Sequence, residues 1–234
     1  MGSVGLGRLN ELGAAHETRG VNGRLTAWLA LVFALAGLNY AARFTSGKPA
    51  KNVLYQWGTA VGSLVIFALI LIVVLLIARG APGLLAWRRP RSWKRAVRIA
   101  PGVLIGVYVV AGVLSPLLHP GREQGLTPSG WQPAHAGAFA ANALVVCGLA
   151  PFVEETTFRG AGFALISARW GNAAAIGATA VLFGLAHGLV EALPVLVAFG
   201  LGLAWLRHRV GSTIPGMILH GTFNALALVF SLAI

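Results

Sequence analysis

The stretch PFVEETTFRGAGF, residues 151–163, places two adjacent glutamates and one arginine in a chain that is otherwise strongly apolar. All six acidic residues of the chain are glutamates, and two of them stand side by side here. Residues four apart share one face of a helix, so Glu155 and Arg159 are expected to form an ion pair. Glu154 is rotated by about 100° and points elsewhere. The stretch therefore predicts one glutamate neutralised by its own arginine and one left for another role.

The composition of the chain is that of a membrane protein. Of its 234 residues, 57% are hydrophobic and only 10% are charged, and the mean hydropathy is +0.78. A soluble domain is about one quarter charged, and an apolar run of about 20 residues is long enough to cross a bilayer. We therefore expect an all-α fold, a polytopic transmembrane helix bundle of about seven to eight membrane helices, with the functional site between the C-terminal helices.

The apolar runs give the expected positions of these helices. After a polar N-terminal tail, residues 1–24, we expect a single membrane domain over residues 25–234. The expected spans cover residues 25–42, 57–78, 99–118, 136–170, 173–187, 193–206 and 214–234. The run 136–170 is too long for one simple span, so it forms either a long tilted helix or two helices that meet near Pro151.

Basic residues give the chain a net charge of +12 and cluster next to the spans. Six of them lie within residues 88–98, and Trp87 and Trp93 accompany them, which is typical of a membrane interface. A second cluster contains Arg207 and Arg209. We interpret the charge as cytoplasmic flanks and as contact with anionic lipid through the 88–98 segment, not as a nucleic-acid surface. Seven spans then place the N-terminus in the cytoplasm, and the excess of Arg, Ala and Gly favours a bacterial plasma membrane.

Two later apolar runs carry polar residues at helical spacing. LFGLAHG places Phe183 and His187 four residues apart, and ILHGTFNAL does the same for His220 and Asn224. An ionisable side chain at membrane depth costs at least ~2.5–3.5 kcal/mol and persists where it faces a cavity and has partners. A single histidine in a span is more often a packing residue. The combination predicts that Glu154, both histidines and the asparagine converge on one cavity.

These three motifs resemble the hallmarks of the CPBP family of intramembrane proteases. That family includes the CAAX prenyl endopeptidases of eukaryotes and the bacterial abortive-infection and bacteriocin self-immunity proteins. Its EExxxR, FxxxH and HxxxN motifs correspond here to residues 154–159, 183–187 and 220–224, in the same order. The resemblance implies a membrane-embedded endopeptidase whose catalytic core lies within residues 136–234.

The resemblance also implies roles for the motif residues. Glu154 is the general base, and His187 positions the water that it activates. His220 and Asn224 donate hydrogen bonds to the oxyanion. The supporting residues are Glu155, Arg159 and Phe183. The expected substrate is a membrane-associated peptide or protein.

Two questions stay open at this point. Glu154, His187 and His220 could ligate one Zn²⁺ and leave a position for water, but a metal-free, glutamate-activated water is equally compatible with these residues. The same intramembrane Glu, His and Arg residues would serve a proton-coupled transporter, although the chain is short and has no inverted repeat. A non-catalytic membrane scaffold or immunity factor is the other alternative.

The connection GLVEALP, residues 188–194, carries a topological prediction. His187 ends one span, whereas His220 lies some way along the last one. For the two histidines to meet, the connection must dip into the membrane as a broken or re-entrant segment, with Glu191 and Pro194 lining a water-filled cavity.

Overall fold

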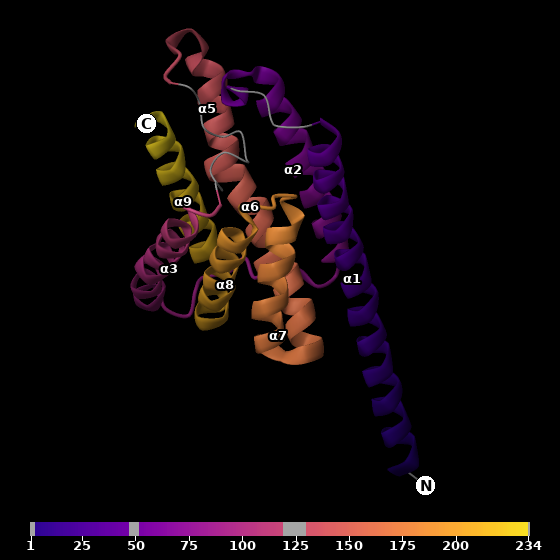
Figure 1. Ribbon diagram of the computed structural model, residues 1–234. Helices are drawn as coiled ribbons and strands as arrows, with labels where there is room; N and C mark the ends of the chain where they lie inside the picture. Colours follow the sequence, from indigo (N-terminus) through magenta and orange to yellow (C-terminus); the bar gives the residue numbers. More distant parts are fainter. Residues whose placement is uncertain (1–2, 47–51, 119–129, 234) are drawn as a thin grey trace.

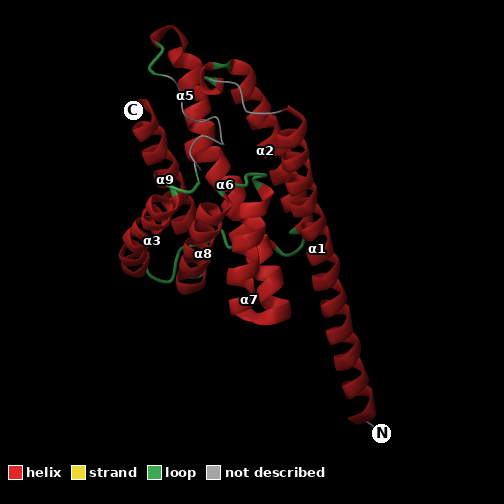
Figure 2. Ribbon diagram, viewed as in Figure 1, coloured by secondary structure: helices red, strands yellow, loops and turns green. Residues whose placement is uncertain are grey.

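The computed structural model describes residues 3–46, 52–118 and 130–233, and within these ranges the chain forms helices and no strand (Figures 1 and 2). The all-α prediction is confirmed. The long helices are α1 (Ser3–Ser46), α2 (Trp57–Ile77), α3 (Trp93–Leu114), α7 (Phe163–Ala186), α8 (Leu193–Val210) and α9 (Ile214–Ala233). The short elements are η1 (Val53–Tyr55), η2 (Pro82–Leu85), η3 (Pro133–His135), α5 (Ala136–Leu144), η4 (Val145–Leu149), α6 (Ala150–Glu155) and η5 (Thr156–Gly162).

Six helical stretches among the described residues are long and apolar enough to cross a membrane. They cover residues 20–45, 57–77, 93–114, 133–186, 193–210 and 214–232. The number is slightly lower than the expected seven to eight because 133–186 counts once. Gly171 interrupts that stretch with non-helical angles, φ 82° and ψ 172°, and α7 doubles back in Figure 1.

The first helix is longer than the first expected span. Residues 3–24 of the expected polar tail continue into the span as part of α1, because this stretch contains no proline to break the helix. The inner face of α1 carries Leu25, Trp28 and Val32, which are buried in the bundle and follow helical spacing.

The apolar stretch from Ala136 onwards forms one helical run that does not break at Pro151. Pro151 is the second residue of α6, and the five residues of η4 immediately before that helix form a π-helix. Proline lacks an N–H and its ring clashes with the preceding turn. A widened turn placed just upstream accommodates that clash, so the run continues through α6 into a second π-helical segment, η5, and then into α7.

The segment between α2 and α3 folds back against the end of α8. Arg91 N donates to the carbonyl of Val210 at 2.8 Å, and an Nη1 hydrogen of Arg95 reaches the carbonyl of Arg209 at 3.3 Å. The two basic clusters therefore lie together on one side of the bundle, as the topology predicted. Ser92 caps α3 by accepting from Arg95 N, so the later residues of the 88–98 segment belong to that helix.

Candidate active site

The short helix α6 directs its two glutamates in different directions, as their spacing predicted. Glu155 is fully buried, whereas the side chain of Glu154 is 19% exposed. Glu154 Oε2 lies 3.9 Å from His187 Nε2 and 3.8 Å from His220 Nε2. Side chains from α6, from the end of α7 and from α9 thus surround one small space.

Glu155 is a bridge between two of its neighbours. Its Oε1 accepts from Arg159 Nη1 at 3.0 Å, which is the predicted ion pair, and contacts His220 Nδ1 at 3.2 Å. A carboxylate oxygen only accepts, so His220 Nδ1 carries a hydrogen. Glu155 therefore fixes the ring of His220 with Nε2 facing Glu154, a contact that the sequence motifs do not specify.

The second histidine is fixed in the same way by the main chain. His187 Nδ1 lies 2.7 Å from the carbonyl of Phe183, which again places the hydrogen on Nδ1 and leaves Nε2 toward Glu154. The turn after His187 is held by α1, where Asn39 Nδ2 donates to the carbonyl of Ala186 at 2.7 Å. Gly188 has φ 65° and packs against the Asn39 backbone, where a side chain would collide.

The connection between α7 and α8 is irregular over residues 187–192, and in Figure 1 it lies level with α6 near the middle of the bundle. His187 and His220 meet at Glu154, as the re-entrant hypothesis required. Glu191 is half-buried and Pro194 is exposed; that they line a water-filled cavity stays a prediction.

Phe183 occupies the centre of the site and is fully buried. Its ring makes edge contacts with His187 and His220, with centroid distances of 4.6 and 5.8 Å. The guanidinium of Arg159 lies over the same ring, 4.3 Å from its centroid. One aromatic side chain thus separates the buried cation from both imidazoles while touching all three.

Side chains from other helices donate hydrogen bonds to backbone carbonyls of the buried η5 segment. Trp28 Nε1 donates to the carbonyl of Thr157 at 2.9 Å, and Arg207 Nε donates to the carbonyl of Arg159 at 3.0 Å. Arg207 is only 9% exposed, so it supports the site in addition to belonging to the second basic cluster. The signal in the sequence that could have indicated this role is helical spacing, which places Arg207 on the same face of α8 as Gly200 and Leu203.

Asn224 lies on the His220 face of α9 but bonds elsewhere. Its Nδ2 donates to the carbonyl of Val146 within η4 at 2.8 Å. Close packing brings α9 to this position: an added Cβ at Gly221 would collide with the carbonyl of Cys147, and one at Gly216 would lie 2.8 Å from Glu155 Oε2. The structure therefore brings together all the predicted site residues except Asn224, which contacts the adjacent widened turn.

The central space between Glu154, His187 and His220 is rich in acceptors. With both Nδ1 atoms protonated, each neutral ring presents a lone pair at Nε2. Within the described part of the chain, Glu154 Oε2 is buried and receives no hydrogen bond. A single water can donate only two hydrogens to these three acceptors. The space therefore suits a cation, either a proton on one imidazole or a metal ion.

The same three side chains have the chemistry of metal ligands. Two His and one Glu form the donor set of a three-ligand zinc site with an open position, and the carboxylate partner of His220 is typical of such sites. The described residues contain no group of three or more His, Cys, Asp or Glu side chains already spaced for a metal. Ligand atoms bound to zinc are about 3.3 Å apart, so the 3.8–3.9 Å separations would have to contract by about half an ångström.

Comparison with known proteins agrees with the motifs. Residues 136–226 match the family model described as type II CAAX prenyl endopeptidase Rce1-like. The family resemblance is confirmed for this part of the chain, which contains all three motifs. Comparisons with curated proteins and with solved structures each give no match.

Proposed function

We propose that this integral membrane protein is an endopeptidase that hydrolyses a peptide bond of a membrane-associated protein or peptide, using a water activated by Glu154 and histidine. The observation that carries the proposal is the convergence of Glu154 Oε2 with the Nε2 atoms of His187 and His220, at 3.9 and 3.8 Å. These separations are too long for direct hydrogen bonds, and a water would bridge the atoms once the side chains move slightly apart. The side chains of Glu154 and His187 remain 19% and 24% exposed, so part of each residue can be reached from outside the bundle.

The water would donate one hydrogen to Glu154 and the other to His187. We assign a proton to His220, because Glu155 accepts from its Nδ1 and stabilises the imidazolium. Its Nε2–H would then donate to the oxyanion as the water attacks the scissile carbonyl. Glu154 takes the water proton and passes it to the leaving amine, which yields one carboxylate-bearing and one amine-bearing product.

A zinc ion would be held by Glu154, His187 and His220, where it would polarise the carbonyl and acidify the bound water. In that case Glu155 would act by holding the His220 ring, as carboxylates behind metal-bound histidines do. Glu154 cannot be both a metal ligand and the general base, so the two schemes make different predictions for chelators.

For the orientation, we propose a cytoplasmic N-terminus. The adjacent basic clusters around Arg95 and Arg209 are then cytoplasmic, in agreement with the positive-inside rule. For the substrate, the name of the family model specifies prenylated proteins. A lipidated C-terminal peptide is therefore the first substrate to test, beside an unlipidated peptide of the same sequence.

The experiment uses the purified full-length protein in nanodiscs with these two fluorogenic peptides. Glu154→Gln, His187→Ala and His220→Ala are compared with wild type, and His208→Ala is the control because His208 lies outside the site. We expect cleavage to fall by about 10²–10⁴-fold in the three site variants and to be unchanged in the control. Loss of wild-type activity with chelator and its return with Zn²⁺ would favour the metal; resistance would favour the protonated His220.

Two outcomes would contradict the proposal. If wild type cleaves neither peptide nor any of a mixed peptide library, and the site variants retain a cellular phenotype, a scaffold or immunity role is favoured. If wild-type proteoliposomes acidify in response to a solute gradient and Glu154→Gln abolishes this, the site serves a proton-coupled transporter.

A further inference from the structure

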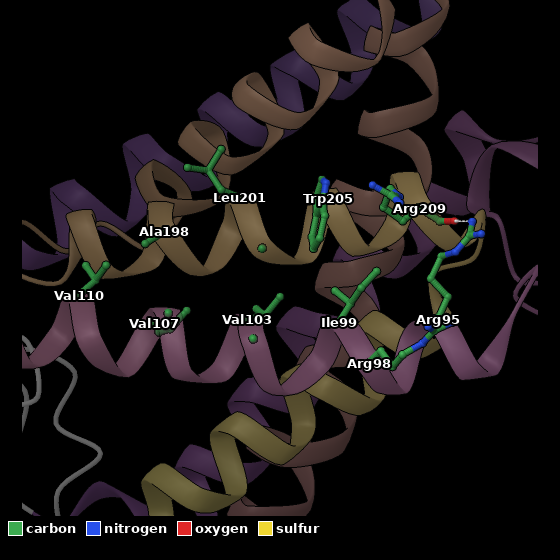
Figure 3. A pocket seen from close by; sticks show the side chains of 13 residues that line it. Arg95, Arg98, Ile99, Val103, Val107, Val110, Ala198, Leu201, Trp205 and Arg209 are labelled. Atoms are coloured by element: carbon green, nitrogen blue, oxygen red, sulfur yellow. Dashed lines mark hydrogen bonds between the residues drawn. The ribbon is translucent and has the colours of Figure 1, made fainter.

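A groove of about 800 Å³ lies between α3 and α8, on a different face of α8 from the active site. Figure 3 shows its walls: apolar side chains along both helices, with arginines at one end. None of the motif residues lines it. Its lining residues are Arg95, Arg98, Ile99, Gly102, Val103, Gly106, Val107, Val110, Ala198, Leu201, Gly202, Trp205 and Arg209.

The arginine end of the groove lacks countercharge. Arg95, Arg98 and Arg209 are exposed, and none of them takes part in an ion pair within the described residues. Arg95 Nη1 and Arg98 Nε each donate to one backbone carbonyl, and the Arg209 guanidinium lies 5.4 Å from the Trp205 ring centroid. Guanidinium groups have five donors each, so most of their hydrogen-bonding capacity faces outward.

The rest of the groove has the length and chemistry of a lipid chain. From Ile99 to Val110 the α3 wall rises eleven residues, or about 16 Å, which is close to half of a hydrocarbon core of about 30 Å. Trp205, with its exposed ring beside the arginines, is typical of the headgroup level. Gly102 and Gly106 leave space, because an added Cβ at either position meets nothing within 4 Å.

We propose that this α3–α8 groove is a specific site for one anionic phospholipid. The phosphate binds Arg95, Arg98 and Arg209, and one acyl chain lies along the apolar wall from Ile99 to Val110. The positive charge at one end and the apolar length of the other select this occupant over a neutral lipid, which brings no net charge to the arginines. The site is independent of the proposed catalysis, because it shares no residue with it.

The charge requirement is tested on the full-length protein in detergent, by native mass spectrometry with added phosphatidylglycerol or phosphatidylcholine. The variant Arg98→Gln/Arg209→Gln is compared with Arg89→Gln/Lys94→Gln, which removes the same charge from the same basic region outside the groove. Each groove arginine contributes about a factor of five near a headgroup, so we expect phosphatidylglycerol binding to fall at least about 10-fold in the first variant only. Equal losses of phosphatidylglycerol binding in both double variants would show that the lipid is attracted by the overall positive charge of the region, and this would contradict the proposed site.

The chain requirement is tested by filling the groove. Gly106→Leu adds a side chain to the open wall, and Gly112→Leu is the control because Gly112 also meets nothing within 4 Å but does not line the groove. We expect phosphatidylglycerol binding to fall at least about 10-fold in Gly106→Leu and to stay unchanged in Gly112→Leu. Glycerol 3-phosphate should not compete at the same concentration. Competition by it, or full binding to Gly106→Leu, would show a simple phosphate site and contradict the proposal.

Discussion

The helix α2 and the helical stretch Pro133–Ala186 differ in how hydrophobic they are and in how much of each is buried. The most apolar 18-residue window of α2 has a mean hydropathy of 3.3, yet only 17% of its residues are buried. The corresponding values for Pro133–Ala186 are 1.8 and 33%. The most hydrophobic helix is thus the more exposed one, because its surroundings are lipid. The scarce polar groups lie in the interior instead, because lipid offers no hydrogen-bond partners and the protein itself must supply them.

The strongest test of this difference removes the buried cation. Arg159→Met leaves Glu155 as a buried charge without its ion-pair partner, and we expect the free energy of unfolding to fall by about 3–5 kcal/mol. The measurement is the SDS-induced unfolding midpoint in detergent. The double variant Arg159→Met/Glu155→Gln should recover part of the loss. A single variant as stable as wild type would show that the ion pair does not support the fold.

The next test separates the two adjacent glutamates. Glu154→Gln should lower peptide cleavage by about 10³-fold while leaving the SDS midpoint near that of wild type, because Glu154 Oε2 receives no hydrogen bond within the described residues. Glu155→Gln should lower the midpoint, because Glu155 Oε1 holds both Arg159 and His220. If both substitutions destabilise the protein equally, the assignment of separate roles is wrong.

A smaller effect is expected where α1 packs against the site. A Cβ added at Gly162 would collide with the ring of Trp28, so Gly162→Ala should cost about 1–3 kcal/mol of stability through overpacking. Gly177→Ala is the matched control, since a Cβ there meets nothing within 4 Å and alanine favours helix. Thermal unfolding of both variants in the same detergent is the measurement. Equal unfolding temperatures for the two variants would show that Gly162 is not in close contact with Trp28.

The smallest effect is expected on the lipid face of α2. Leu69 is 58% exposed, and Leu69→Ala should change the free energy of unfolding by less than about 0.5 kcal/mol. Val74 in the same helix is fully buried, and Val74→Ala should cost at least about 1 kcal/mol. Comparing the SDS-induced unfolding midpoints of the two variants tests whether each apolar side chain of α2 faces lipid or packs inside the bundle. A larger effect at Leu69 would indicate an additional packing partner on that face.

Much of this arrangement could be predicted from the sequence. The four-residue spacing of Glu155 and Arg159 was sufficient to predict their ion pair, and the motifs predicted the convergence of Glu154 with two histidines. These predictions work because each one depends only on regular helical spacing or on the scarcity of charge in apolar runs.

The remaining features depend on departures from regular helix. Asn224 contacts Val146, and Arg207 contacts Arg159, through carbonyls that lie in π-helical segments. A pattern search that assumes 3.6 residues per turn does not reveal such segments. The sequence places Arg207 in one basic cluster with Arg209, because composition alone does not distinguish a buried arginine at a helix end from an exposed one.

The widened turn η5 has a consequence for how this protein tolerates changes in length. A π turn holds one residue more than an α turn, so loss of a single residue from Thr156–Gly162 can be absorbed by reversion to α-helix. The helices on either side would keep their register, whereas Arg159 and the carbonyls bound by Trp28 and Arg207 would shift around the axis. Deletion of one codon from this segment is therefore expected to leave the helix bundle folded while misaligning Arg159 and the residues that it supports.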